Sequence, residues 1–237
     1  MSSPTVATAT GSDQDASPWA RRLQAACLVL FPLLFLVFAG TDLHPSPSGD
    51  STADQLRAVA ASAGAWQVVH LILAGASLLG MGAVLGLRSL VPRSGRLSAA
   101  ASIAAALGGA AAGLVAGIVL MEAALVAPVA KACAASSSCL SPGSQPFLSE
   151  FTDASWNDVA HLSYAAGTLI FSLATLAVLG WAAKAVRPWE ALVMVVGAVG
   201  IYATDTALHG DAKYGLAFLL AASASIALKT ERSSRHG

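Results

Sequence analysis

Six long apolar stretches, separated by shorter polar segments, dominate the hydrophobic pattern of the chain. They cover residues 23–40, 66–87, 97–127, 159–183, 189–209 and 212–228. A helix needs roughly 20 apolar residues to cross about 30 Å of hydrocarbon. Five stretches are long enough. The sixth is shorter, but Lys213 and Lys229 lie near its ends, where their side chains can reach the polar boundary. The pattern predicts an all-α multi-pass membrane protein with six transmembrane helices.

The composition agrees with a membrane protein. The mean hydropathy is +0.68 and only 11% of the residues are charged, whereas about 25% are charged in an ordinary soluble domain. No basic stretch is interleaved with aromatic residues, which argues against nucleic-acid binding. The expected partner is therefore the lipid bilayer, and the expected location is the cell membrane.

The basic residues predict the orientation of the helices. Ten of them lie on one side of the predicted spans and three on the other. Basic residues accumulate in cytoplasmic segments, so the N- and C-termini are both predicted to be cytoplasmic. The larger group consists of Arg21, Arg22, Arg88, Arg93, Arg96, Lys184, Arg187, Lys229, Arg232 and Arg235, and the smaller of Arg57, Lys131 and Lys213.

The chain is expected to form one membrane domain between two tails. Residues 1–18 predict a disordered cytoplasmic tail, residues 19–229 the six-helix domain, and residues 230–237 a second cytoplasmic tail. Arg21, Arg22 and the apolar run up to Ala39 also resemble a cleaved signal peptide, which would remove the first helix. The long polar segment ahead of this run favours a retained helix.

Two segments on the predicted outer side carry local signals. Residues 52–55 (Thr-Ala-Asp-Gln) fit a capping box and are followed by apolar residues at helical spacing. They predict a short amphipathic helix on the outer face. Residues 128–158 are expected to form a polar loop that contains Cys133 and Cys139. On an oxidising side of the membrane, these two cysteines predict a disulfide.

Glycines at a spacing of four residues predict close helix packing. Small residues let two helix backbones approach in a membrane, where no hydrophobic effect drives helices together. The third predicted helix has three such glycines and the second has two: Gly109, Gly113 and Gly117, and Gly82 and Gly86.

A weak internal similarity relates the second and third predicted helices to the fourth and fifth. Residues 66–71 (WQVVHL) resemble residues 156–162 (WNDVAHL), and residues 116–125 resemble residues 199–208. A two-helix internal repeat would place His70 against His161 and Glu122 against Asp205.

The strongest functional signal is a layer of titratable residues. Seven of them fall at the predicted outer ends of the helices: Asp42, His44, His70, Glu122, His161, Asp205 and His209. Polar groups near lipid are costly unless they are hydrated, neutral or paired. Solvation alone explains the residues at the water boundary, but His70, His161, Glu122 and Asp205 are set further in. The candidate site is therefore these four residues together with His209, which shares a helix face with Asp205.

Three functions are compatible with this layer. In the leading hypothesis, His70 and His161 bind haem or a transition metal for redox chemistry, with His209 as a further metal ligand and the two acids in support. In the second, Glu122 and Asp205 are catalytic acid–base groups of an isomerase or cyclase that acts on a hydrophobic, isoprenoid-like small molecule. In the third, the protein is structural or a transporter and carries out no catalysis. No motif with diagnostic spacing, such as C-x-x-C-H or H-E-x-x-H, decides between them.

Overall fold

The fold is all-helical throughout the residues that the computed structural model describes, which are 17–40, 52–136, 145–207 and 212–235. Those residues form seven helices: α1 (Pro18–Gly40), α2 (Thr52–Ala61), α3 (Ala63–Ser89), α4 (Arg96–Ala134), α5 (Gln145–Ala182), α6 (Pro188–Ala207) and α7 (Ala212–Arg235). Six are long and correspond in order to the six predicted apolar stretches, and α2 is the predicted short helix.

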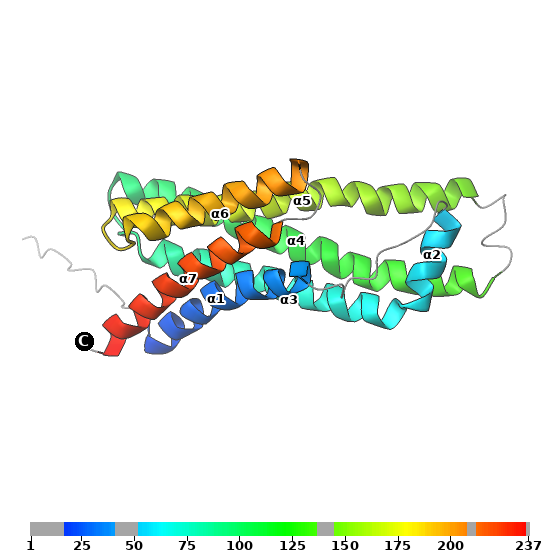
Figure 1. The fold of residues 1–237 in the computed structure, drawn as a ribbon, viewed down its shortest axis with the longest axis horizontal. Coiled ribbons are helices and arrows are strands. Elements are labelled where there is room, and N and C mark those ends of the chain that lie inside the picture. The colour runs from blue at the N-terminus through cyan, green and yellow to red at the C-terminus, as the bar shows by residue number, and fades with distance from the viewer. Residues whose placement is uncertain (1–16, 41–51, 137–144, 208–211, 236–237) are drawn as a thin grey trace, which may run out of the picture.

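The long helices form an elongated bundle with two different ends (Figure 1). At one end, here called the basic end, α1, α6 and α7 lie beside α3, α4 and α5. Towards the other end only α3, α4 and α5 continue, and α2 crosses over them. α7 packs against both α1 and α6, while α1 and α6 do not touch. The basic end carries the connections between α3 and α4 and between α5 and α6, with Arg93 and Lys184.

Four of the helices are long and apolar enough to cross a membrane: segments of α1, α3, α4 and α5. The described part of α6, Pro188–Tyr202, is apolar but shorter. These helices expose many large apolar side chains to their surroundings, including Leu78, Leu85 and Leu114. A soluble bundle would cover such residues, whereas lipid solvates them. The architecture is that of a helical membrane protein.

The predicted loop at residues 128–158 is largely wrong. α4 continues through Pro128 to Ala134, and α5 already begins at Gln145. Pro128 is exposed, and Ala127, Ala130 and Cys133 around it are buried against α2. Packing of this face keeps the helix intact although proline removes one of its hydrogen bonds. At the C-terminus, α7 is helical to Arg235, beyond the apolar stretch that ends at residue 228.

Glycines permit close packing on α3, as predicted, but two of the three glycines that were predicted to do so on α4 do not. A Cβ atom built on Gly82 would lie 2.5 Å from Sγ of Cys27 in α1. In α4, Gly109 and Gly117 face open space, with no heavy atom within 4 Å of such a Cβ. The close approach of α4 is made instead by Gly108, whose Cβ would lie 2.8 Å from Cβ of Ser172 in α5. Spacing alone did not identify which face of the glycine-rich helix is buried.

A buried carboxylate that the sequence analysis did not single out fixes the basic end. Glu190, near the start of α6, is fully buried. Its Oε2 accepts a hydrogen bond from the backbone N–H of Arg187 at 2.8 Å, and its Oε1 accepts one from the Ser225 hydroxyl of α7 at 2.6 Å. Lys229 Nζ of α7 also donates to the Ala185 carbonyl at 2.8 Å. Together these bonds attach α7 to the connection between α5 and α6.

Candidate functional site

The structure brings together two of the predicted site residues, His70 of α3 and Glu122 of α4. His70 Nε2 lies 3.2 Å from Glu122 Oε2, and their side chains are 3% and 14% exposed. The other ring nitrogen, Nδ1, lies 2.7 Å from the backbone carbonyl oxygen of Trp66, one turn earlier in α3. Both nitrogens of a buried imidazole therefore have a defined partner, and this orients the ring.

These contacts define where protons can be. A carbonyl oxygen only accepts hydrogen bonds, so His70 Nδ1 must carry a hydrogen and donate it to Trp66. A further proton shared between Nε2 and Oε2 would turn their contact of 3.2 Å into a hydrogen bond. It makes the pair an imidazolium–carboxylate ion pair when it is on nitrogen and a neutral imidazole–carboxylic acid pair when it is on oxygen. The net charge of the pair is zero in both forms, which lowers the cost of burying it.

The pair lies beneath a cover at the end of the bundle where α2 crosses. The Trp66 ring stacks on the His70 ring, with centroids 4.4 Å apart and an interplanar angle of 27°. Leu56 and Val59 of α2 pack with Trp66 in one buried cluster. His70 lies 19 residues before Ser89, the end of α3, which is roughly 28 Å along the helix. That distance places the pair near the edge of a hydrocarbon layer of about 30 Å.

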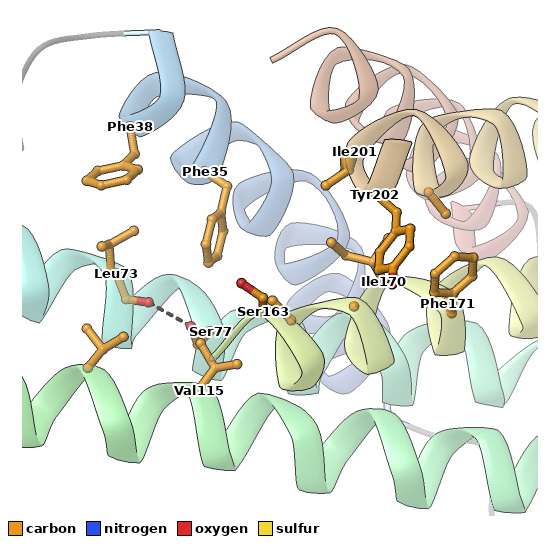
Figure 2. Close-up of a pocket in the computed structure, with 14 residues that line it drawn as sticks. Phe35, Phe38, Leu73, Ser77, Val115, Ser163, Ile170, Phe171, Ile201 and Tyr202 are labelled. Atoms are coloured by element: carbon orange, nitrogen blue, oxygen red, sulfur yellow. Dashed lines mark hydrogen bonds between the residues drawn. The ribbon is translucent and has the colours of Figure 1, made fainter. Parts of the chain in front are cut away.

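An apolar cavity of about 210 Å³ includes Leu73 of α3 and Val119 of α4 in its lining, three positions along each helix from His70 and Glu122. Figure 2 shows Phe35 and Phe38 of α1 at one side of the cavity and Ile201 and Tyr202 of α6 at the other. Among the described residues that line it, Ser77, Ser163 and Tyr202 contribute hydroxyls and none is charged. The Ser77 hydroxyl donates to the Leu73 carbonyl at 2.9 Å (Figure 2).

On α3 and α4, the inner residues of the predicted layer lie just beyond the described lining of this cavity, towards α2. His70 lies three residues from the lining residue Leu73, and Glu122 three from Val119. Three residues correspond to about 4.5 Å along a helix. By helix register, His70 and Glu122 therefore lie near one end of the described lining.

Five further residues of the predicted layer lie outside the described side chains. The side chains of His161 and Asp205 lie outside the described part of the chain, and so do His209, Asp42 and His44. Within the part that is described, no three side chains of His, Cys, Asp and Glu are grouped so that they could hold a metal ion. The pair of His70 and Glu122 is thus the described portion of the predicted site, and the roles of His161, Asp205 and His209 stay predictions.

Cys133 is buried near the end of α4, in the cluster beneath α2. Its predicted disulfide partner, Cys139, lies outside the described residues. The disulfide therefore stays a prediction. Cys27 is a free, buried cysteine of α1, as the sequence analysis expected for a residue inside an apolar stretch.

Sequence reasoning missed the cavity and the ring that covers the imidazole. The cavity is lined by phenylalanines, small residues and three hydroxyls from five helices, and such residues are ordinary in a membrane segment. The spacing of four residues between Trp66 and His70 was the signal for their contact, because such residues are neighbours on a helix.

Comparisons with known proteins identify no family for this chain. No family model, curated protein or solved structure matches the chain.

Proposed function

We propose that this multi-pass membrane protein is an acid–base enzyme that acts on a hydrophobic, isoprenoid-like molecule bound in the apolar cavity. The observation that carries the proposal is the contact of 3.2 Å between His70 Nε2 and Glu122 Oε2. The two residues lie three positions along α3 and α4 from Leu73 and Val119, which line that cavity. A buried pair that shares one proton can both donate and accept protons without acquiring a net charge. Asp205 and His161 are further candidates for the same layer, by their helix positions.

The reaction class that suits this pair is the shift of a carbon–carbon double bond, or a cyclisation that begins in the same way. With the pair in its neutral form, Glu122 donates its proton to one alkene carbon and a carbocation forms. His70 Nε2 then removes a proton from a neighbouring carbon, and a new double bond forms. Transfer of that proton from Nε2 to Oε2 restores the starting pair. Protons and electrons balance, and no oxidant or cofactor is required.

The apolar surroundings favour such chemistry. None of the described residues that line the cavity is charged, so a bound molecule displaces little tightly held water. The described geometry places the pair one turn from the lining residues, so the reacting carbons would have to lie at the end of the cavity nearest Leu73 and Val119.

Deuterium incorporation tests this proposal. Purified protein in liposomes is incubated in D₂O with farnesol and geranylgeraniol, and carbon-bound deuterium in the lipid extract is measured by mass spectrometry. We expect incorporation with the parent protein and a loss of about 10² to 10⁴-fold in Glu122→Gln. Met121→Ala, a change at an exposed neighbouring residue, should behave like the parent. Equal incorporation by the parent and by Glu122→Gln would exclude the assignment.

Binding of haem or a transition metal is the second candidate function. The hydrogen bond from His70 Nδ1 to the Trp66 carbonyl supports it, because metal-bound histidines commonly use their second nitrogen in this way. A ligand set would need His161, His209 or Asp205 in addition. An absorption spectrum and elemental analysis of detergent-purified protein provide the test. A Soret band or a stoichiometric metal would favour this function, and the absence of both would exclude it.

The proposed topology has six transmembrane helices, with the basic end and both termini in the cytoplasm of a cell-membrane protein. It is supported by Arg88, which donates to the Val91 carbonyl and to the hydroxyls of Ser98 and Ser102 at the basic end. The end where α2 crosses would then face an oxidising compartment, where Cys133 and Cys139 would form a disulfide. Accessibility of single introduced cysteines to a membrane-impermeant maleimide in intact cells tests the orientation.

A further inference from the structure

A second hollow on the surface of the bundle adjoins the apolar cavity. This groove, of about 640 Å³, runs along α4 and α5 and is more open than the cavity. The two hollows share four of their lining residues: Ser163, Gly167, Phe171 and Tyr202. The groove lies within the apolar segments of α4 and α5 that are long enough to cross a membrane. Its surroundings in the membrane are therefore lipid chains.

Two aromatic rings stand between the groove and the cavity. Phe171 of α5 and Tyr202 of α6 meet edge to face, with ring centroids 6.0 Å apart and an interplanar angle of 63°. Both side chains are substantially exposed, so their rotation is not restricted by tight packing. Exposed side chains change rotamer within picoseconds to nanoseconds. Figure 2 shows the two rings side by side at one edge of the cavity.

Gly167 lines both hollows and has open space in front of it. A Cβ atom built on Gly167 would have no heavy atom within 4 Å, although the residue lines both hollows. Any side chain at this position would project into the open space. Gly117 of α4 also faces open space, but it lines neither hollow, so the two glycines form a matched pair for a test.

We propose that the groove and the cavity form one binding site for a single long hydrocarbon chain, which enters sideways from the bilayer between the rings of Phe171 and Tyr202. Three observations specify this occupant. The two hollows share four lining residues, none of the described residues that line either of them is charged, and the groove opens where lipid chains surround the protein. An apolar cavity of roughly 150 Å³ already stays dry and accepts a benzene-sized molecule. The cavity here is larger and holds the tip of the chain. The hydroxyls of Ser163 and Tyr202 can bind a single polar group on it.

This inference deepens the proposed function, because it names a linear hydrocarbon chain as the class of substrate and orients it. A chain that enters past Phe171 and Tyr202 and reaches Leu73 and Val119 would present its innermost carbons to the His70–Glu122 pair. The binding itself does not depend on acid–base chemistry, so the two proposals can fail separately.

Photo-crosslinking tests the site. The probe is a long-chain alcohol with a diazirine at the end remote from the hydroxyl, incorporated into liposomes that contain the protein. After irradiation, labelled peptides are identified by mass spectrometry. We expect labelling of the α1 peptide that contains Phe35 and Phe38, and a fall of at least tenfold in Gly167→Leu. Gly117→Leu should be labelled like the parent. Gly167→Ala, a smaller change in the same open space, should give an intermediate decrease and serves if the leucine variant fails to fold.

The outcomes separate the hypotheses. Equal labelling in Gly167→Leu and Gly117→Leu, or labelling spread evenly over the exposed faces of the helices, would overturn the site, because the probe would then report bulk lipid. Glu122→Gln should be labelled like the parent. Normal labelling without deuterium incorporation would refute only the proposed chemistry. Deuterium incorporation by a protein that shows no labelling in α1 would refute only the site.

Discussion

The contact between His70 and Glu122 predicts energetic coupling between α3 and α4 that a double-mutant cycle can measure. The two side chains are 3% and 14% exposed and 3.2 Å apart. Hydrogen bonds between transmembrane helices contribute about 0.6 kcal/mol on average and up to about 1.7 kcal/mol, and hydrogen bonds to charged groups about 1.5–3 kcal/mol. The two ranges overlap at about 1.5–1.7 kcal/mol, and we expect the coupling energy of this buried pair to lie near that value.

The single variants should differ for stated reasons. Glu122→Ala leaves His70 Nε2 buried without its hydrogen-bond partner and should lower the free energy of unfolding by about 2 kcal/mol. His70→Ala also removes the ring stacked on Trp66 and the hydrogen bond from Nδ1, and should cost about 3 kcal/mol. Glu122→Gln should cost less than about 1 kcal/mol, because the amide can still donate to Nε2.

The measurement is an SDS titration of the detergent-solubilised protein, followed by circular dichroism. The control cycle combines Leu71→Ala and Met121→Ala, which neighbour the pair in sequence but are 56% and 44% exposed. That cycle should be additive within about 0.5 kcal/mol. If the cycle of His70 and Glu122 were equally additive, the pair would not be an energetic unit, and the reasoning that assigns it a shared proton would be refuted.

Three further predictions concern packing, the buried acid and the cysteines. Gly82→Ala should destabilise the protein by about 1–3 kcal/mol, because its methyl group would overlap Cys27 in α1. The control Gly117→Ala, in open space, should be neutral or stabilising in the same SDS titration. Equal changes in the free energy of unfolding for the two variants would contradict the packing of α1 against α3. Glu190→Ala should lower the free energy of unfolding by about 1–3 kcal/mol and Glu190→Gln by clearly less, because this carboxylate accepts two hydrogen bonds. Equal destabilisation of the two variants in thermal unfolding would argue that these hydrogen bonds do not stabilise the basic end. Denatured, unreduced protein should bind one maleimide–polyethylene glycol, at Cys27, and denatured, reduced protein should bind three, as resolved by gel mobility. Three labels before reduction would exclude the disulfide of Cys133 and Cys139. That disulfide is expected to stabilise the protein by about 2 kcal/mol, because it closes a short loop.

The order and approximate positions of the long helices could be predicted because each carries a long apolar stretch. The short helix α2 could also be predicted, because its start signal and the periodicity of Leu56 and Val59 act locally. Pro128 gave the wrong helix end, since the contacts that hold this part of α4 come from α2, which is distant in sequence. The buried face of the glycine-rich helix could not be identified either. Gly108 and Gly109 are equivalent in composition, and only the position of α5 distinguishes them.

The candidate site could be located from the sequence to the level of a layer, but not to its contacts. Any polar residue of a membrane helix is stabilised at the membrane boundary, because its side chain reaches water and lipid headgroups there. Depth therefore does not separate a functional histidine from a solvated one. His70 is separated by its partners: a carboxylate on the next helix, a carbonyl one turn away and an indole stacked on its ring. Neither α3 nor α4 alone contains this information.

The position of this pair relative to the cavity is the observation that solvation does not account for. If the titratable residues merely marked the water boundary, their helix positions would not need to coincide with one end of an apolar hollow. On α3 and α4, however, His70 and Glu122 each lie three residues beyond a lining residue, on the side towards α2. Water is the usual partner of polar groups at this depth, but Trp66 and α2 cover His70 and leave it 3% exposed. A polar pair withdrawn from water and placed at the end of an apolar hollow is the arrangement that proton transfer to a hydrophobic molecule requires.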